Sequence, residues 1–230
     1  MILYNCRLLL WLKTTCQSLV TGGPHMEFEF RPSQPSDAEI AVPLIYSSGP
    51  KPLEYGFSLG KHTAHEFMAY AFSQETGLFS WRNHPVAMLN NEIVGISTFF
   101  GANEYRRRVL ELMVQVLRFC PQAFPRWAYR GLHLQAICPT PSRNALYITH
   151  GGVRADTQSR GIATAWIRHL RTVAVQQGKQ ILSLDVSANN PRAQALYERL
   201  GFVVTRLQKF PGPAGLVDDY RRMELKLDGR

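Results

Sequence analysis

The 230-residue sequence has few of the features that mark membrane, metal-binding or disulfide-rich proteins. It contains no uninterrupted run of about 18 apolar residues, which excludes a typical transmembrane helix. Its 4 cysteines show neither C-x-x-C spacing nor the density of a disulfide framework, which favours a reducing, cytoplasmic setting. The motifs of P-loop nucleotide hydrolases, dinucleotide enzymes and H-E-x-x-H zinc proteases are also absent, and no metal site is predicted.

Positive charge is in excess, with a formal net charge of +9. The lysines and arginines are scattered, and Arg106 to Arg108 form the only run of three. This distribution is typical of a solvated surface that can also meet a polyphosphate ligand. We therefore expect neither a nucleic acid nor a membrane as the partner.

The first 25 residues differ from the rest, because they contain Arg7 and Lys13, no acid, and a short apolar run that Lys13 ends. The run is short for the apolar region of a signal peptide. We expect residues 1–25 to be an extension outside the fold and residues 26–230 to form one domain, with an insertion at about 102–144. A length of 230 residues suits one domain with a sizeable core.

The first half of the domain predicts a strand at 27–31, helices at 37–46 and 62–75, and a strand hairpin at 85–89 and 93–100 that turns at Asn90-Asn91. A helix is predicted at 104–120. The proline-containing stretch 121–141 is interpreted as an irregular surface insertion.

The second half predicts a strand at 145–153, an amphipathic helix at 161–177 and a strand at 181–186. A strand-helix-strand unit of this kind places its strands parallel with a right-handed crossover. A further helix at 191–200 and strands at 202–206 and 220–227 follow.

The segment Gln158-Ser159-Arg160-Gly161-Ile162-Ala163 lies where a predicted strand passes into a helix. A helix start offers unpaired N–H groups and a partial positive charge, which suit a phosphate. Gly161 and Ala163 leave the backbone open to oxygens, and Arg160 adds a full charge. A glycine at a helix start is also common for structural reasons alone.

This string fits the Q/R-x-x-G-x-G/A signature, and Asn189-Asn190, Ala193, Ala195 to Glu198 and Leu200-Gly201-Phe202 follow at the spacing of one crossover. In these motifs the chain resembles the GNAT (Gcn5-related N-acetyltransferase) superfamily, most strongly over residues 145–202. The resemblance implies a mixed α/β (α+β) fold, with a central, mostly antiparallel sheet, one parallel crossover and flanking helices. It also implies acetyl-CoA as cosubstrate.

The resemblance further implies roles for individual residues. The backbone of Gly151, Gly152 and Val153 would hold the pantetheine arm, and the Val153 N–H would face the thioester carbonyl. The pyrophosphate would lie on Gln158, Ser159, Arg160, Gly161, Ile162 and Ala163. Asn190 matches a cofactor-contacting asparagine, and Tyr197 matches the proposed general acid. The sequence departs from the family pattern at two places. Ala163 replaces the second glycine, which the signature permits. Gly151-Gly152 lie in a strand that is usually richer in apolar residues, so the geometry of this strand near the thioester stays open.

Acetyl transfer to an amine requires a proton acceptor, because an alkyl amine with a pKa of about 10 is mostly protonated at pH 7. His150 is the first candidate base, since imidazole titrates near neutrality. Glu92 is the second, and deprotonation through water without a dedicated base stays open. Tyr197 could protonate the leaving thiolate, or its ring could serve packing alone.

The acceptor is predicted only as a small-molecule or peptide amine, whose pocket Arg106 to Arg108, Trp127 and the segment from Tyr46 to Tyr55 could line. The chain is expected to be a monomer or a homodimer.

An acyltransferase (EC 2.3.1.-) is the favoured function, and a catalytically silent acyl-CoA-binding module is the alternative. A basic nucleic-acid-binding surface is favoured by no motif. The remote alternative is a serine hydrolase that uses Ser58 of Gly56-x-Ser-x-Gly60, although no apolar strand precedes this motif.

Overall fold

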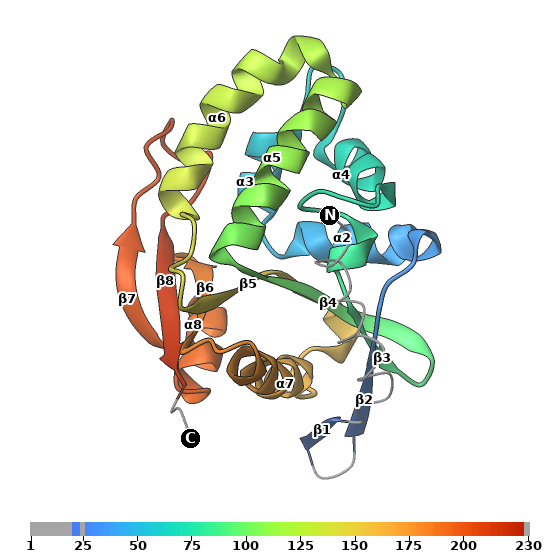
Figure 1. The fold of residues 1–230 in the computed structure, drawn as a ribbon, viewed down its shortest axis with the longest axis vertical. Coiled ribbons are helices and arrows are strands. Elements are labelled where there is room, and N and C mark those ends of the chain that lie inside the picture. Colours follow the sequence, from blue (N-terminus) through green and yellow to red (C-terminus); the bar gives the residue numbers. More distant parts are fainter. Residues whose placement is uncertain (1–19, 24–25, 228–230) are drawn as a thin grey trace.

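The computed structural model describes residues 20–23 and 26–227, which form a mixed sheet with helices on both faces (Figure 1). The eight strands follow the order β1-β2-β3-β4-β5-β6-β8-β7. Only β5 and β6 pair in parallel, and the other neighbours are antiparallel. This confirms the predicted mixed, mostly antiparallel fold. The strands are β1 (Val20–Gly23), β2 (Met26–Arg31), β3 (Val86–Leu89), β4 (Glu92–Gly101), β5 (Ala145–Val153), β6 (Ile181–Ser187), β7 (Val203–Gln208) and β8 (Tyr220–Lys226).

The helices divide between the two faces of the sheet (Figure 1). One face carries α2 (Ala38–Ser47), α3 (Pro50–Phe57), α4 (Ala64–Ser73), α5 (Ala102–Phe119) and α6 (Phe124–Ile137). The other carries α7 (Ile162–Gln176) and α8 (Pro191–Arg199). Short 3-10 turns lie in the connections between helices and strands: η1 (Pro35–Asp37), η2 (Trp81–Asn83), η3 (Pro121–Ala123) and η4 (Ala155–Thr157).

Two hydrophobic cores follow from the alternation of side chains along the strands. On β5, Leu146 and Ile148 belong to the core beneath α7, whereas Tyr147 belongs to the core beneath α2, α4 and α5. The strand is therefore covered on both faces, which explains its near-continuous apolar pattern over its first four residues.

The predicted hairpin and crossover are both present. Asn90 and Asn91 adopt φ values of 51° and 64°, the left-handed conformation that a two-residue hairpin turn requires. The helix α7 then connects β5 to its parallel neighbour β6.

Two segments were predicted wrongly. Residues 124–137, interpreted as irregular, form the helix α6, and residues 50–57, where no helix was predicted, form α3. The prolines that suggested loops lie in the first turns of these helices, where their missing N–H groups have no intrahelical partner in any case.

The segment predicted as an extension also contributes to the sheet. Val20 and Thr21 of β1 pair with Phe28 and Glu27 of β2. Residues 1–19, the greater part of that extension, lie outside the described residues.

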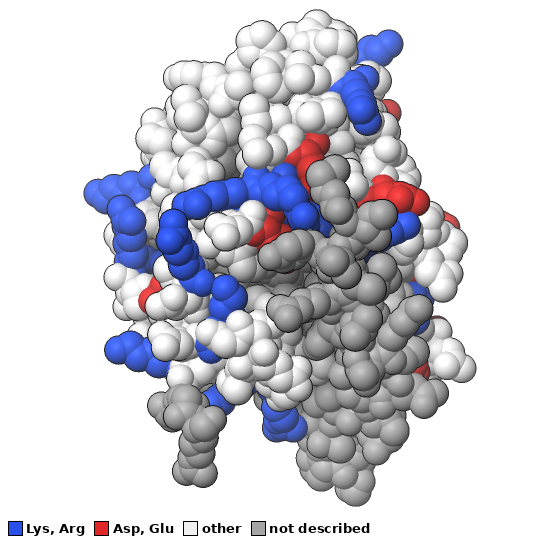
Figure 2. Space-filling model, in the orientation of Figure 1, with Lys and Arg blue, Asp and Glu red and all other residues white. Residues whose placement is uncertain are grey.

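The run Arg106 to Arg108 lies in the second turn of the helix α5 and is not a uniform basic patch. Arg106 and Arg107 are exposed, whereas Arg108 is buried and pairs with Glu111 at 3.0 Å and with Glu104 at 3.4 Å. Figure 2 shows lysines and arginines spread over this face and interspersed with acids. The run therefore presents two arginine side chains to solvent, not three.

Candidate functional site

The strands β5 and β6 separate towards their carboxyl ends. Residues 145–148 of β5 pair with residues 181–184 of β6, and the pairing ends there. β5 nevertheless continues to Val153, and β6 continues to Ser187 while it stays paired with β8. Carboxyl ends of neighbouring parallel strands are a common ligand-binding position in α/β proteins. The backbone of residues 149–153 has no partner on β6, so one side of this strand can hydrogen-bond an extended ligand.

A β-bulge on β5 accompanies this separation. Thr149 pairs with Thr98 and Gly152 pairs with Ile96, so His150 and Gly151 together lie opposite the single residue Ser97. His150 takes up the extra residue in a left-handed conformation, with a φ of 54°. Bulges bend a strand, re-aim its side chains and recur beside active sites. The bulge therefore turns His150 out of the regular alternation at the point where β5 leaves β6.

The pair Gly151-Gly152 has a structural explanation in helix α2. A Cβ on Gly152 would lie 2.7 Å from the carbonyl carbon of Leu44 and 3.0 Å from Ser47 Oγ, both near the end of α2. Only a glycine lets the helix backbone lie directly on the strand here. Gly151 is exposed, and a Cβ there would meet only Ser97 Oγ, at 3.9 Å.

The turn at residues 158–163 is open at its surface. Gly161 is the N-cap of α7 with a φ of 88°, and Ser159 is also left-handed, with a φ of 65°. No side chain caps the helix, and no acid lies in its first turn. Gln158, Ser159 and Arg160 are exposed. The first N–H groups of α7 are therefore free of side-chain acceptors within the described residues, which favours binding of an anion.

A second arginine reaches this turn from α8. Arg192 Nη2 donates to Ser159 Oγ at 3.0 Å, and Arg192 is itself exposed. Its guanidinium adds positive charge beside Arg160.

Asn190 and Tyr197 both belong to α8 or its cap. Asn190 Oδ1 accepts the Ala193 N–H at 3.0 Å, so its side-chain oxygen caps the helix. The Tyr197 ring packs edge-on against Phe202, with centroids 5.6 Å apart. Burial raises the pKa of Tyr197, and its hydroxyl has no hydrogen-bond partner among the described residues. Its phenol is therefore protonated at neutral pH and free to donate.

The imidazole of His150 contacts two other rings, those of Phe79 and His84. Phe79 stacks on it with centroids 4.8 Å apart, and His84 Nε2 lies 3.0 Å from His150 Nδ1. Burial holds the pKa of His150 well below its usual value, and the neighbouring His84 lowers it further. The ring is therefore neutral at pH 7.

Glu92 is not brought together with His150. It begins β4, 65% of its side chain is exposed, and it pairs with Arg154 at 2.8 Å. Gly95, three residues further along β4, is the residue that pairs with Val153. Glu92 therefore lies beyond the end of β5. Its role as a base stays a prediction, as do the roles of the other site residues.

The two histidines give the protein a pH-dependent stability. Burial lowers the pKa of His84 to about 4, so between pH 4 and 6.5 the unfolded chain binds more protons than the folded chain. The contribution of His84 to the free energy of unfolding is fully present above pH 6.5 and is lost as the pH falls towards 4. The loss from this residue is at most about 3 kcal/mol. Urea unfolding at pH 7.5 and 4.5 measures the loss. His84→Gln is the control, because the carboxylates titrate equally in the variant and in the wild-type protein. The variant should therefore lose less free energy of unfolding between pH 7.5 and 4.5, and equal losses in the two proteins would contradict the assignment to His84.

Ser58, the serine of the hydrolase alternative, lies in the wrong context. It is the C-cap of α3, so a helix and not a strand precedes it. Its hydroxyl donates to Glu54, and no histidine among the described residues hydrogen-bonds it. The strand-turn-helix geometry of a nucleophile elbow is therefore absent here.

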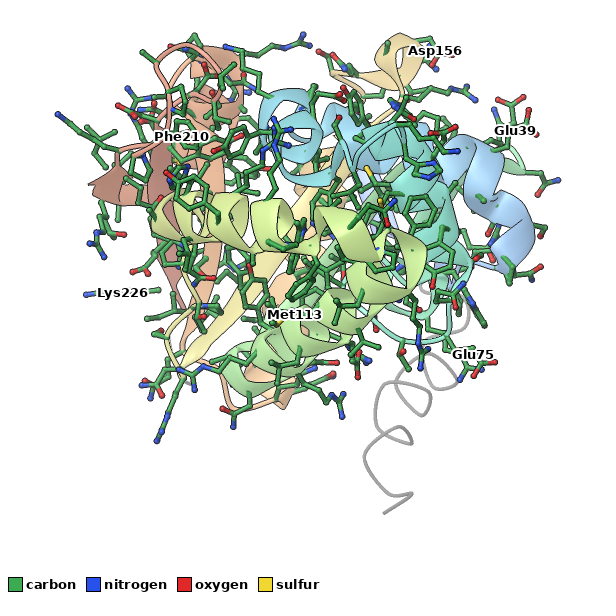
Figure 3. All side chains as sticks on the ribbon, turned by 90° about the horizontal axis from the view of Figure 1, so that it is seen from above. Glu39, Glu75, Met113, Asp156, Phe210 and Lys226 are labelled. Carbon is green, nitrogen blue, oxygen red and sulfur yellow. The ribbon has the colours of Figure 1, made fainter. Side chains whose placement is uncertain are left out.

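The sheet face opposite α7 is covered by α3, by the hairpin of α5 and α6, and by the loop between β7 and β8 (Figure 3). Tyr55 Oη lies 2.7 Å from His133 Nδ1, and Phe210 meets both rings edge-on. Lys51 pairs with Asp218 at 2.6 Å and so ties α3 to that loop. Trp127, expected to line the acceptor pocket, is buried in the core instead.

His84, Ser97 and Lys51 were not singled out from the sequence. Their partners His150, Thr149 and Asp218 are 66, 52 and 167 residues away. No spacing rule connects residues so distant. The local signal in the sequence is a histidine directly ahead of the predicted strand at 85–89, and it is a weak one.

Comparison with known proteins agrees with the fold. A model of the acetyltransferase (GNAT) family matches residues 55–202. A search of curated proteins gave no match. In the part of the chain that the structure describes, each helix is too short or too polar to cross a membrane.

Solved structures of acetyltransferases share the fold at low identity. An N-acetyltransferase from Staphylococcus aureus Mu50 is 17% identical, with a TM-score of 0.62 over 85% of this chain and 99% of that one. A protein described as an acetyltransferase is 18% identical, with a TM-score of 0.57 over 86% and 99%. A spermidine N-acetyltransferase that is a chimera from Vibrio cholerae and hSSAT is 12% identical, with a TM-score of 0.52 over 87% and 95%. The family match spans well over half of the chain and includes β5, the turn and α7, so the protein belongs to the GNAT family of acetyltransferases.

Proposed function

We propose that the protein transfers an acetyl group from acetyl-CoA to a primary amine. The main support for this proposal is that β5 separates from β6 ahead of the open turn at Gly161. Residues 149–153 offer backbone groups to an extended pantetheine, and the N-terminus of α7 offers N–H groups to the pyrophosphate. The two elements are consecutive in the chain, so one extended ligand can use both.

The chemistry needs no covalent enzyme intermediate. The neutral amine attacks the thioester carbonyl, the N–C bond forms and the C–S bond breaks. The Val153 N–H, on the strand edge that β6 leaves free, is the proposed donor to the oxyanion. His150 accepts the amine proton, and Tyr197 protonates the leaving thiolate. Water would then return a proton from His150 to Tyr197, which restores both groups.

The acceptor is proposed only as a small-molecule or peptide amine. The catalytically silent acyl-CoA-binding module is the competing function, since it would use the same turn. Calorimetry with acetyl-CoA tests the shared site. Release of CoA thiol over a panel of polyamines, amino acids, aminoglycosides and peptide N-termini then separates an enzyme from a silent binder. Absence of acetyl-CoA binding would reject both functions.

Tyr197→Phe tests the acid. The phenyl ring keeps its packing on Phe202, whereas the proton donor is lost. We expect kcat to fall by at least about 10-fold and the acetyl-CoA Kd to stay within about 2-fold. Steady-state kinetics and calorimetry on the same preparation measure both, and an unchanged kcat would remove Tyr197 from the mechanism.

A further inference from the structure

The proton positions of the two histidines are fixed by their hydrogen bonds. His84 is fully buried, and its Nδ1 lies 2.9 Å from the carbonyl oxygen of Ser80. A carbonyl oxygen can only accept, so Nδ1 of His84 carries a hydrogen. Its low pKa, caused by burial, keeps the ring neutral at pH 7, and a neutral imidazole has one hydrogen. Nε2 of His84 is therefore an acceptor.

That acceptor faces Nδ1 of His150 at 3.0 Å. The two ring planes differ by 3°, and the centroids are 5.3 Å apart. With the nitrogens 3.0 Å apart, this separation is reached only when the rings meet edge to edge along one line. The hydrogen bond is therefore nearly linear, and Nδ1 of His150 must be its donor.

His150 is then left with an unprotonated Nε2. That nitrogen has no hydrogen-bond partner within the described part of the chain, and His150 is buried only in part. Phe79 stacks on the imidazole with planes 12° apart, which restricts rotation of the ring. The bulge at residues 150–151 places this side chain where β5 leaves β6.

We infer that His84 is a positioning residue for acetyl transfer: by accepting the Nδ1 hydrogen of His150 it keeps Nε2 of His150 as the proton acceptor for the amine. This inference rests on the proposed function. The amine proton moves to Nε2 as the N–C bond forms and the C–S bond breaks. His84 exchanges no proton, because Ser80 and His150 already fix both of its nitrogens.

Within residues 20–23 and 26–227, no acidic side chain acts as a counter-ion for the pair. Phe79 and Ser80 approach it from the residues just ahead of η2, and Ser97 approaches it from β4. Among the described residues, His84 is the titratable group whose charge acts on His150. No carboxylate of the described residues hydrogen-bonds either ring. An imidazolium at His150 is therefore unfavourable, so the acidic limb of the kcat–pH profile should lie below pH 6.5 in the wild-type protein.

The first test is the tautomer in the free protein, by NMR of protein labelled with 15N-histidine. We expect the hydrogen of His150 on Nδ1 at pH 7.5, and a hydrogen on Nε2 would overturn the inference. This measurement needs no substrate. Turnover with the hydrogen on Nε2 would reject only the role of His84, whereas the expected tautomer without turnover of any amine would reject the proposed function.

The second test compares His84→Asn with His84→Gln. The asparagine amide can keep the bond to Ser80 but is too short to reach His150, whereas the glutamine oxygen can take the place of Nε2 as acceptor. We expect His84→Asn to lower kcat by at least about 10-fold and His84→Gln to retain most of it. Acetyl-CoA affinity, measured by calorimetry, should be unchanged in both.

A double-mutant cycle separates positioning from general damage to the fold. His84→Asn should cost nothing further in kcat when His150 is already alanine, because the residue it positions is gone. A loss of the same size in both backgrounds, with thermal unfolding measured in parallel, would show that His84 acts only on the structure and would overturn the inference.

Discussion

Replacing Gly152 with alanine is expected to lower the free energy of unfolding by about 3 kcal/mol. The added methyl group would lie 2.7 Å from the carbonyl carbon of Leu44, which belongs to the backbone of α2. Backbone cannot rotate away as a side chain can, so the helix must shift off β5. Urea unfolding at pH 7.5, monitored by circular dichroism, measures the loss.

Gly151→Ala is the matched control. It adds the same methyl group one residue earlier on the same strand, where the nearest atom would be 3.9 Å away. Its effect should stay within about 0.5 kcal/mol. If the two substitutions destabilised the protein equally, close packing of α2 on Gly152 would not be the reason for that glycine.

The other large effect is expected from Gly161→Asp, which should weaken acetyl-CoA binding by at least about 10-fold. The carboxylate would lie beside the N–H groups proposed to hold the pyrophosphate, and two like charges would then share one small turn. Any side chain here also adopts an unfavourable conformation, because φ at Gly161 is 88°. Titration calorimetry at 0.15 M salt measures the affinity.

Gly178→Asp controls for strain and charge together. Gly178 follows the opposite end of the same helix, has a φ of 67°, and would place a Cβ in open space. The substitution therefore adds the same charge and a similar backbone strain far from the turn. It should leave acetyl-CoA affinity within about 2-fold of the wild type, and equal losses at the two sites would argue against an anion site at Gly161.

The turn and the hairpin show how far local rules reach. Gly161 at a strand-to-helix junction, and Asn90-Asn91 between two apolar runs, each adopt the left-handed conformations that the residue types favour. Helix α7 and strand β6 follow in the same way from periodicity. These features depend on residues within a few positions of one another.

The two helices that were missed show where local rules stop. In a sequence, Pro50 and Pro125 predict a turn or the end of a helix. In the structure each lies in the first turn of a helix, and tertiary packing stabilises that helix. Part of that packing is a small cluster of Ile137, Val217 and Tyr220 with Tyr55 and Phe210, drawn from α3, α6 and the segment that ends in β8. No one of these segments specifies the cluster alone.

The sequence by itself determined the family, the parallel crossover and the turn proposed for pyrophosphate, because each is encoded by neighbouring residues and backbone preference. Only the tertiary structure decided where β5 leaves β6, that Gly152 makes room for α2, and that His84 meets His150 across 66 residues. Such features depend on contacts between particular residues of distant segments, and these contacts have no periodic pattern in the sequence.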